Sequence, residues 1–122
     1  MLGIVGQASC SDMPIGPVRR RFAQRLRALR QAQGISQTDL GVRMGLPPDV
    51  ASARINRYEQ GVHVPDLDTL DAMAKELGVP LPALFAEGPM AELITAFAQL
   101  PAEAQEKVLT TVKRSLKKSK AE

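Results

Sequence analysis

Glycines divide most of this 122-residue chain into short segments with a regular internal pattern. Gly34, Gly45, Gly61 and Gly78 each follow a stretch in which apolar residues recur every three or four positions. This spacing places the apolar residues on one side of an α-helix, and glycine commonly follows the last residue of a helix. Aromatic residues make up only 3% of the chain, so a core must be built from aliphatic side chains. These features predict an all-α fold and argue against a β-sandwich.

Capping residues separate five predicted helices within residues 18–87. Ser36 is a good N-cap with Asp39 three residues later, and Asp66 is a second N-cap. Pro48 and Asp49 suit the first turn of a third helix. The predicted helices cover 18–33, 37–44, 48–60, 66–77 and 80–85, and the fourth has the core stripe Leu67, Leu70, Ala74 and Leu77.

The two ends of the chain differ from this central part. Residues 1–17 are rich in Gly, Ser and Pro and predict a flexible arm, in which Cys10 is an exposed thiol. After a break at Gly88 and Pro89, residues 88–122 predict a helical extension. Its two apolar stripes are Met90, Leu93, Ile94, Phe97 and Leu100, and then Val108, Val112 and Leu116.

The net charge of +3 is the sum of opposed blocks. Residues 18–63 hold nine arginines and three acids, a formal charge of +6. Residues 64–100 hold one lysine and six acids, a charge of −5, and residues 101–122 have a charge of +3. A concentrated positive block is typical of a protein that binds a polyanion.

Several classes of protein are excluded or disfavoured by composition. One histidine and one cysteine are too few for a zinc cluster, and nothing positions the histidine for a catalytic triad. The chain also has no glycine-rich phosphate loop, so we expect no enzyme, no metal and no cofactor. No apolar run is long enough to span a membrane, and a single cysteine fits a reducing cytoplasm.

Two short helices joined by a glycine-containing turn have the form of a helix-turn-helix. The segments RLRALRQAQGISQTDLGVRMG, INRYEQG and PDLDTLDAMAKELGVPLPALF occur in the order and nearly the spacing of one family. Over residues 18–86 the sequence resembles the lambda repressor/Cro-like (XRE) family of DNA-binding domains. The resemblance implies a five-helix lambda-repressor-like domain at 18–87 that binds double-stranded DNA.

The resemblance also implies roles for individual residues. Gln37 matches a position that contacts a DNA phosphate, and Val62 and His63 lie in a loop that touches the backbone. For His63, a plain exposed side chain is an equal alternative. Arg30 and Glu59 match a structural ion pair. The positions that match base-reading residues are Ser52, Ala53 and Arg57, while Arg54 and Asn56 flank them and could reach a phosphate or a neighbouring base.

One spacing departs from the family pattern. Gly45 and Glu59 are fourteen residues apart, whereas the family has about ten, which corresponds to about one extra helical turn. The additional residues either lengthen the third helix at its N-terminus or enlarge the turn before it. The assignments of Ser52 and Ala53 depend on which of these occurs.

The sequence therefore predicts a cytoplasmic transcriptional regulator, most simply a repressor, that reads an operator. Because its apolar stripes need a partner, residues 89–118 are expected to build a homodimer. An alternative is an antitoxin-like or partner-binding regulatory protein that uses the same domain for autoregulation. In that case an unidentified protein partner would bind the extension or the arm.

Overall fold

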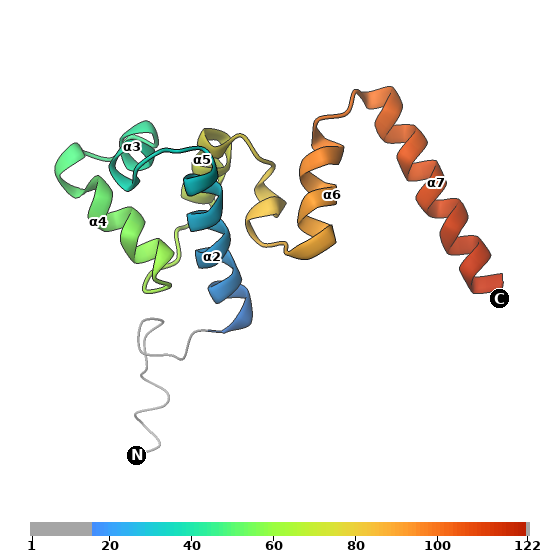
Figure 1. Ribbon diagram of the computed structural model, residues 1–122, viewed down its shortest axis with the longest axis horizontal. Helices are drawn as coiled ribbons and strands as arrows, with labels where there is room; N and C mark the ends of the chain where they lie inside the picture. Colours follow the sequence, from blue (N-terminus) through green and yellow to red (C-terminus); the bar gives the residue numbers. More distant parts are fainter. Residues whose placement is uncertain (1–15, 122) are drawn as a thin grey trace, which may run out of the picture.

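The computed structural model describes residues 16–121 (Figure 1). The predicted arm, residues 1–17, and Cys10 within it fall almost entirely outside the described residues. The described part is helical, with no β-strand among residues 16–121. Its elements are α2 (Pro17–Ala32), α3 (Gln37–Arg43), α4 (Pro48–Glu59), α5 (Leu67–Leu77), the 3₁₀-helix η2 (Leu81–Leu84), α6 (Gly88–Ala98) and α7 (Ala102–Ala121).

The predicted helix starts agree with the local chemistry of the chain. Ser36 accepts a hydrogen bond from the backbone N–H of Asp39 at 2.9 Å, and Asp39 accepts one from the N–H of Ser36 at 3.5 Å, which completes a capping box. Asp66 caps α5 in the same way through the N–H of Thr69, at 2.8 Å. Pro48 is the first residue of α4, where its missing N–H leaves no bond unmade.

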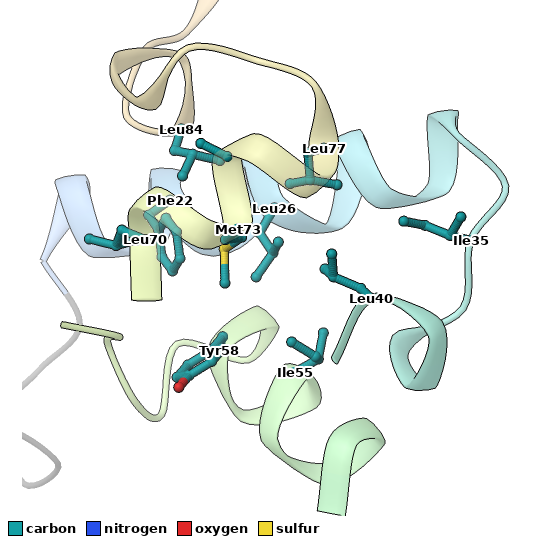
Figure 2. Packing of buried hydrophobic residues seen from close by; sticks show 11 residues of the cluster. Phe22, Leu26, Ile35, Leu40, Ile55, Tyr58, Leu70, Met73, Leu77 and Leu84 are labelled. Carbon is teal, nitrogen blue, oxygen red and sulfur yellow. The ribbon is translucent and has the colours of Figure 1, made fainter. Parts of the chain in front are cut away.

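The core lies between α2, α4 and α5, with contributions from α3 and η2. Figure 2 shows α4 presenting Ile55 and Tyr58 toward the side chains of α2 and α5. Aromatic packing adds to this core, because the rings of Phe22 and Phe85 stack with their centroids 5.8 Å apart. The largest of the almost completely buried side chains are Phe22, Leu26, Leu40, Ile55, Met73, Leu77 and Leu84.

The predicted stripe of α5 was wrong in one member. Leu67 is 75% exposed, whereas Leu70, Ala74 and Leu77 are buried. At 100° per residue, Leu67 lies about 70° from the centre of the buried side, and Met73 lies within it. The buried side of α5 is therefore formed by Leu70, Met73, Ala74 and Leu77.

The region after α5 also differs from the sequence expectation in detail. The predicted fifth helix at 80–85 is a single 3₁₀ turn, Leu81–Leu84. The expected break at Gly88 and Pro89 is the start of α6, since a proline is accepted in the first turn of a helix. Among its described residues α6 has one that is buried, Ala91, and the helix packs on η2.

The helix α7 extends away from the rest of the described chain, at the opposite end of the molecule from α3 and α4 (Figure 1). None of its described side chains is buried. Gln105 connects its first turn to α6 by donating to the carbonyl of Phe97 at 2.8 Å. The two ends of the molecule are therefore built differently: one is a packed helix pair, and the other is an uncovered helix.

Candidate nucleic-acid interface

The helices α3 and α4 form a tightly packed pair at one end of the molecule (Figure 1). Gly41 and Ala51 are both buried where the two helices meet. The connection is short, because α3 ends at Arg43 and α4 begins at Pro48. Since Pro48 belongs to the helix, the extra residues of this chain extend α4 to 12 residues and do not enlarge the turn.

One side of α4 is fixed in the core and the other is free. Ala51, Ile55, Tyr58 and Glu59 are the buried residues of this helix. With 100° per residue, the opposite side is centred on Ala53. All the base-reading candidates are exposed. Asn56 and Arg57 lie about 60° and about 40° to either side of Ala53, whereas Ser52 and Arg54 each lie about 100° from it, at the two borders with the buried side.

The small side chain of Ala53 matters for this arrangement. A methyl group at the centre of the exposed side lets another surface approach the helix backbone closely. The longer side chains at both edges would then reach forward around it. This shape suits insertion of a helix into a groove, which in B-form DNA is wide enough only on the major-groove side.

Arg30 and Glu59 form an ion pair beneath this helix. The Nε of Arg30 lies 2.6 Å from Oε2 of Glu59, and its Nη2 lies 3.1 Å from Oε1. The Glu59 side chain is only 2% exposed. The hydrogen bond with Glu59 raises the pKa of Arg30, against the lowering effect of burial. Arg30 also donates to the carbonyl of Ile35 at 2.9 Å, so the pair links α2, the loop before α3 and the end of α4.

Gln37 links this ion pair to the exposed side of α4. Its Nε2 donates to Oε1 of Glu59 at 3.1 Å and to Oδ1 of Asn56 at 3.2 Å. Its Oε1 accepts from the hydroxyl of Ser52 at 3.3 Å. The structure thus joins three of the predicted site residues, Gln37, Ser52 and Asn56, through one amide group.

Arg54, Arg57 and His63 line a second part of the surface, a shallow hollow of about 450 Å³. Its other walls come from the loop after α4 and from the start of α5, including Pro65, Asp66 and Thr69. The two guanidinium groups and the imidazole therefore come from segments that converge on one side of α4. A concave surface with this charge suits an anionic group such as a backbone phosphate.

Other arginines that form the positive block have structural partners. Arg19 donates to the carbonyl of Val62 at 2.7 Å, and Arg25 donates to the carbonyl of Ala83 at 3.2 Å. Arg21 donates to the carbonyl of Phe85 at 3.2 Å and pairs with Glu87 at 3.2 Å. No sequence signal predicted these contacts, because each joins residues that are far apart along the chain.

Two features of other classes of protein, a metal cluster and a membrane-spanning helix, are absent from residues 16–121. No group of three or more histidine, cysteine or acidic side chains there is arranged to hold a metal ion. No helix in the same range is long and apolar enough to cross a membrane.

Comparison with known families and structures points to one class of protein. A helix-turn-helix family model matches residues 26–84, which include α3 and α4. The transcriptional regulator BswR has a similar crystal structure, with a TM-score of 0.69 and 34% sequence identity. That similarity covers 75% of this chain and 92% of BswR.

A second solved structure shares the fold. The hypothetical transcription factor NHTF from Neisseria has a TM-score of 0.54 and 24% identity, covering 70% of this chain and 91% of that one. No curated protein matches the sequence. The arrangement of α3 and α4 is thus common to this chain and to solved transcription factors.

Proposed function

Because the chain belongs to the XRE-type helix-turn-helix family of transcriptional regulators, we propose that it binds double-stranded DNA sequence-specifically and represses transcription at an operator. The observation that carries this proposal is the exposed side of α4. It presents hydrogen-bonding side chains around Ala53, while its opposite side is held in the core. In this arrangement α4 enters the major groove and α3 lies across the DNA backbone.

The individual contacts follow from chemistry and position. Arg57 would bind guanine through O6 and N7, which its planar guanidinium matches in a bidentate way. Arg54 and His63, which line the same hollow, would bind a phosphate, Arg54 through its charge and His63 through a ring N–H. The charge of residues 18–63, +6, supports attraction to the DNA backbone, and of the acidic residues of 64–100 only Asp66 lines this hollow.

Repression requires no further machinery. A protein that occupies an operator excludes RNA polymerase from the same stretch of DNA by its volume alone. The proposed role is therefore binding and not catalysis. It calls for no cofactor.

We further propose that residues 89–118 form a homodimer interface. Leu109, Val112 and Leu116 are 42%, 44% and 56% exposed, and they lie on one side of α7. Leu93 of α6 is also exposed and lines an apolar hollow of about 430 Å³ with Val112 and other residues of both helices. An exposed apolar surface of this kind marks an interaction site in a soluble protein.

The charge distribution of α7 supports a second copy of the chain as the partner. The first half of the helix contains Glu103 and Glu106, whereas the second half carries five cations: Lys113, Arg114, Lys117, Lys118 and Lys120. If two α7 helices paired in antiparallel orientation, the basic second half of each helix would lie beside the glutamates in the first half of the other. A two-fold axis between them would relate two α4 helices, as a palindromic operator requires.

Selection of binding sites from random duplex DNA tests the proposal. We expect an inverted repeat whose half-sites lie one helical turn or a multiple of it apart. Binding to the selected site should weaken linearly in log Kd as log salt concentration rises. Selection of no sequence at all would reject sequence-specific binding, and recovery of single half-sites would reject the dimer.

A further inference from the structure

The ion pair below α4 has a consequence for the DNA-facing surface above it. A carboxylate accepts hydrogen bonds and cannot donate them. The end of the Gln37 amide that faces Oε1 of Glu59, 3.1 Å away, must therefore be its nitrogen. Because Glu59 is held by Arg30 through two bonds and its side chain is 2% exposed, its carboxylate is fixed in place as the acceptor that Gln37 faces. The orientation of the Gln37 amide is thus fixed by the Glu59 carboxylate.

The orientation of the Gln37 amide in turn fixes the orientation of the Asn56 amide. The second hydrogen of Gln37 Nε2 points at Asn56, 3.2 Å away, so the atom of Asn56 that faces it must be the oxygen Oδ1. The amide nitrogen of Asn56 is then directed toward solvent, on the exposed side of α4.

The Ser52 side chain is oriented in the opposite sense, because its hydroxyl donates to Gln37. Gln37 presents its oxygen to the Ser52 hydroxyl at 3.3 Å, so the hydroxyl hydrogen is used in that bond. The lone pairs of the Ser52 oxygen are left for an external partner. Ser52 and Asn56 are four residues apart and therefore lie on the same side of α4, one turn from each other.

We propose that Glu59 and Gln37 are positioning residues that set which hydrogen-bonding groups α4 offers to DNA: a donor at Asn56 and an acceptor at Ser52. A free asparagine binds adenine by donating to N7 and accepting from N6. Asn56 has its oxygen engaged by Gln37, so it selects bases that offer acceptors. Guanine, with N7 and O6 in the major groove, presents two of them. Ser52 selects the exocyclic amino group of cytosine or adenine.

This inference rests on the proposed function and assigns Gln37 a different role from a phosphate contact. Both amide hydrogens of Gln37 are used within the protein. A phosphate contact through that amide would break one of the two bonds. Gln37 therefore acts on base choice through Asn56 and Ser52.

Two substitutions test the chain of hydrogen bonds. In Glu59→Gln, the new amide keeps its oxygen at the Oε2 position, toward Nε of Arg30, and turns its NH₂ toward Gln37, so the bond from Nη2 of Arg30 to Oε1 is lost. Gln37 then presents its oxygen both to this NH₂ group and to Asn56, which reverses Asn56 and Ser52. In Gln37→Ala the constraint is lost and Asn56 is free to bind adenine.

The measurement is site selection from random DNA with each purified full-length variant, after thermal melting has shown that it is folded. Selection with Asn56→Ala first identifies the base pair that Asn56 reads, as the position where preference is lost. We expect wild type to prefer guanine there, Glu59→Gln to prefer a base with an exocyclic amino group, and Gln37→Ala to lose about tenfold in discrimination between guanine and adenine. Gln24→Ala, an exposed glutamine of α2, is the matched control and should select as wild type does.

The outcomes separate this inference from the proposed function. If both variants keep the wild-type base at the Asn56 position, the inference is overturned while sequence-specific binding stands. If Glu59→Gln does not fold, Gln37→Ala decides alone, because it leaves the ion pair intact. If wild type selects no sequence, the proposed function itself fails.

Discussion

Gly41 and Ala51 lie so close together that a Cβ atom on Gly41 would come within 2.6 Å of the Cβ of Ala51. It would also meet the Ala51 Cα at 3.0 Å and its carbonyl oxygen at 3.1 Å. Two of these three atoms are backbone, which cannot move without shifting α4. The distance between the two helices of the motif is therefore set by the absence of a side chain at Gly41.

Gly41→Ala should destabilise the protein by about 1–3 kcal/mol, the usual cost of forcing extra volume into a packed interior. The expected result is a lower denaturant midpoint in chemical unfolding. Gly16→Ala is the matched control, because a Cβ there meets nothing within 4 Å. Equal effects from the two substitutions would mean that the close approach does not set the helix spacing.

Glu59→Ala should destabilise by about 3 kcal/mol, because it leaves the guanidinium of Arg30 without its partner in a partly buried place. Asp71→Ala breaks an exposed pair with Lys75, whose side chain is 74% exposed, and should change stability by less than about 0.5 kcal/mol. Both values come from urea unfolding monitored by circular dichroism. A stability loss at Glu59 no larger than that at Asp71 would contradict the structural role of the pair.

Asp66 should make the free energy of unfolding depend on pH. Its hydrogen bond from the backbone N–H of Thr69 lowers the pKa of its carboxyl. Because the folded pKa lies below the unfolded value, this stabilisation is complete above the unfolded pKa and is lost as pH falls through the folded pKa. The melting temperatures of wild type and Asp66→Asn, which keeps a cap oxygen without a titrating group, should therefore differ more at neutral pH than in acid. A constant difference across that range would exclude Asp66 as the titrating group.

Arg57→Ala should weaken binding to the selected operator by about 1–3 kcal/mol and relax base preference at one position of each half-site. Quantitative gel shifts on the operator and on single-base variants give both values. Arg27→Ala, an exposed arginine of α2, removes the same charge away from α4 and serves as the control. An equal loss on every DNA sequence would make Arg57 a phosphate contact instead.

Leu116→Asp should raise the dissociation constant of the dimer at least about tenfold, since it places a charge in the proposed apolar interface. Sedimentation velocity over a range of protein concentrations measures this. Leu67→Asp is a close control, because Leu67 is also an exposed leucine, 75% exposed, but lies on α5. A dimer that tolerates the change at Leu116 would place the interface elsewhere.

The helices were predictable because their signals are local. The capping box of Ser36 and Asp39 and the cap at Asp66 involve residues within one turn, so their geometry follows from the sequence. The resemblance to the XRE family was confirmed over residues 26–84 for the same reason, since its motifs follow the helices of that range. Leu67 shows where the local pattern fails: its spacing fits the stripe, but only packing against the other helices determines which residues of a turn are covered.

The sequence by itself determined the all-α class, the helix boundaries to within a few residues, the positive charge of residues 18–63 and the helix-turn-helix motif within them. Each of these depends on neighbours along the chain or on composition. Tertiary structure alone decided that Gln37 joins Glu59 to Asn56, that Arg19, Arg21 and Arg25 bind distant carbonyls, and that within residues 16–121 no described side chain of α7 is buried. Hydrogen bonds between residues far apart along the chain depend on how helices pack, and no periodicity or spacing in the sequence records that geometry.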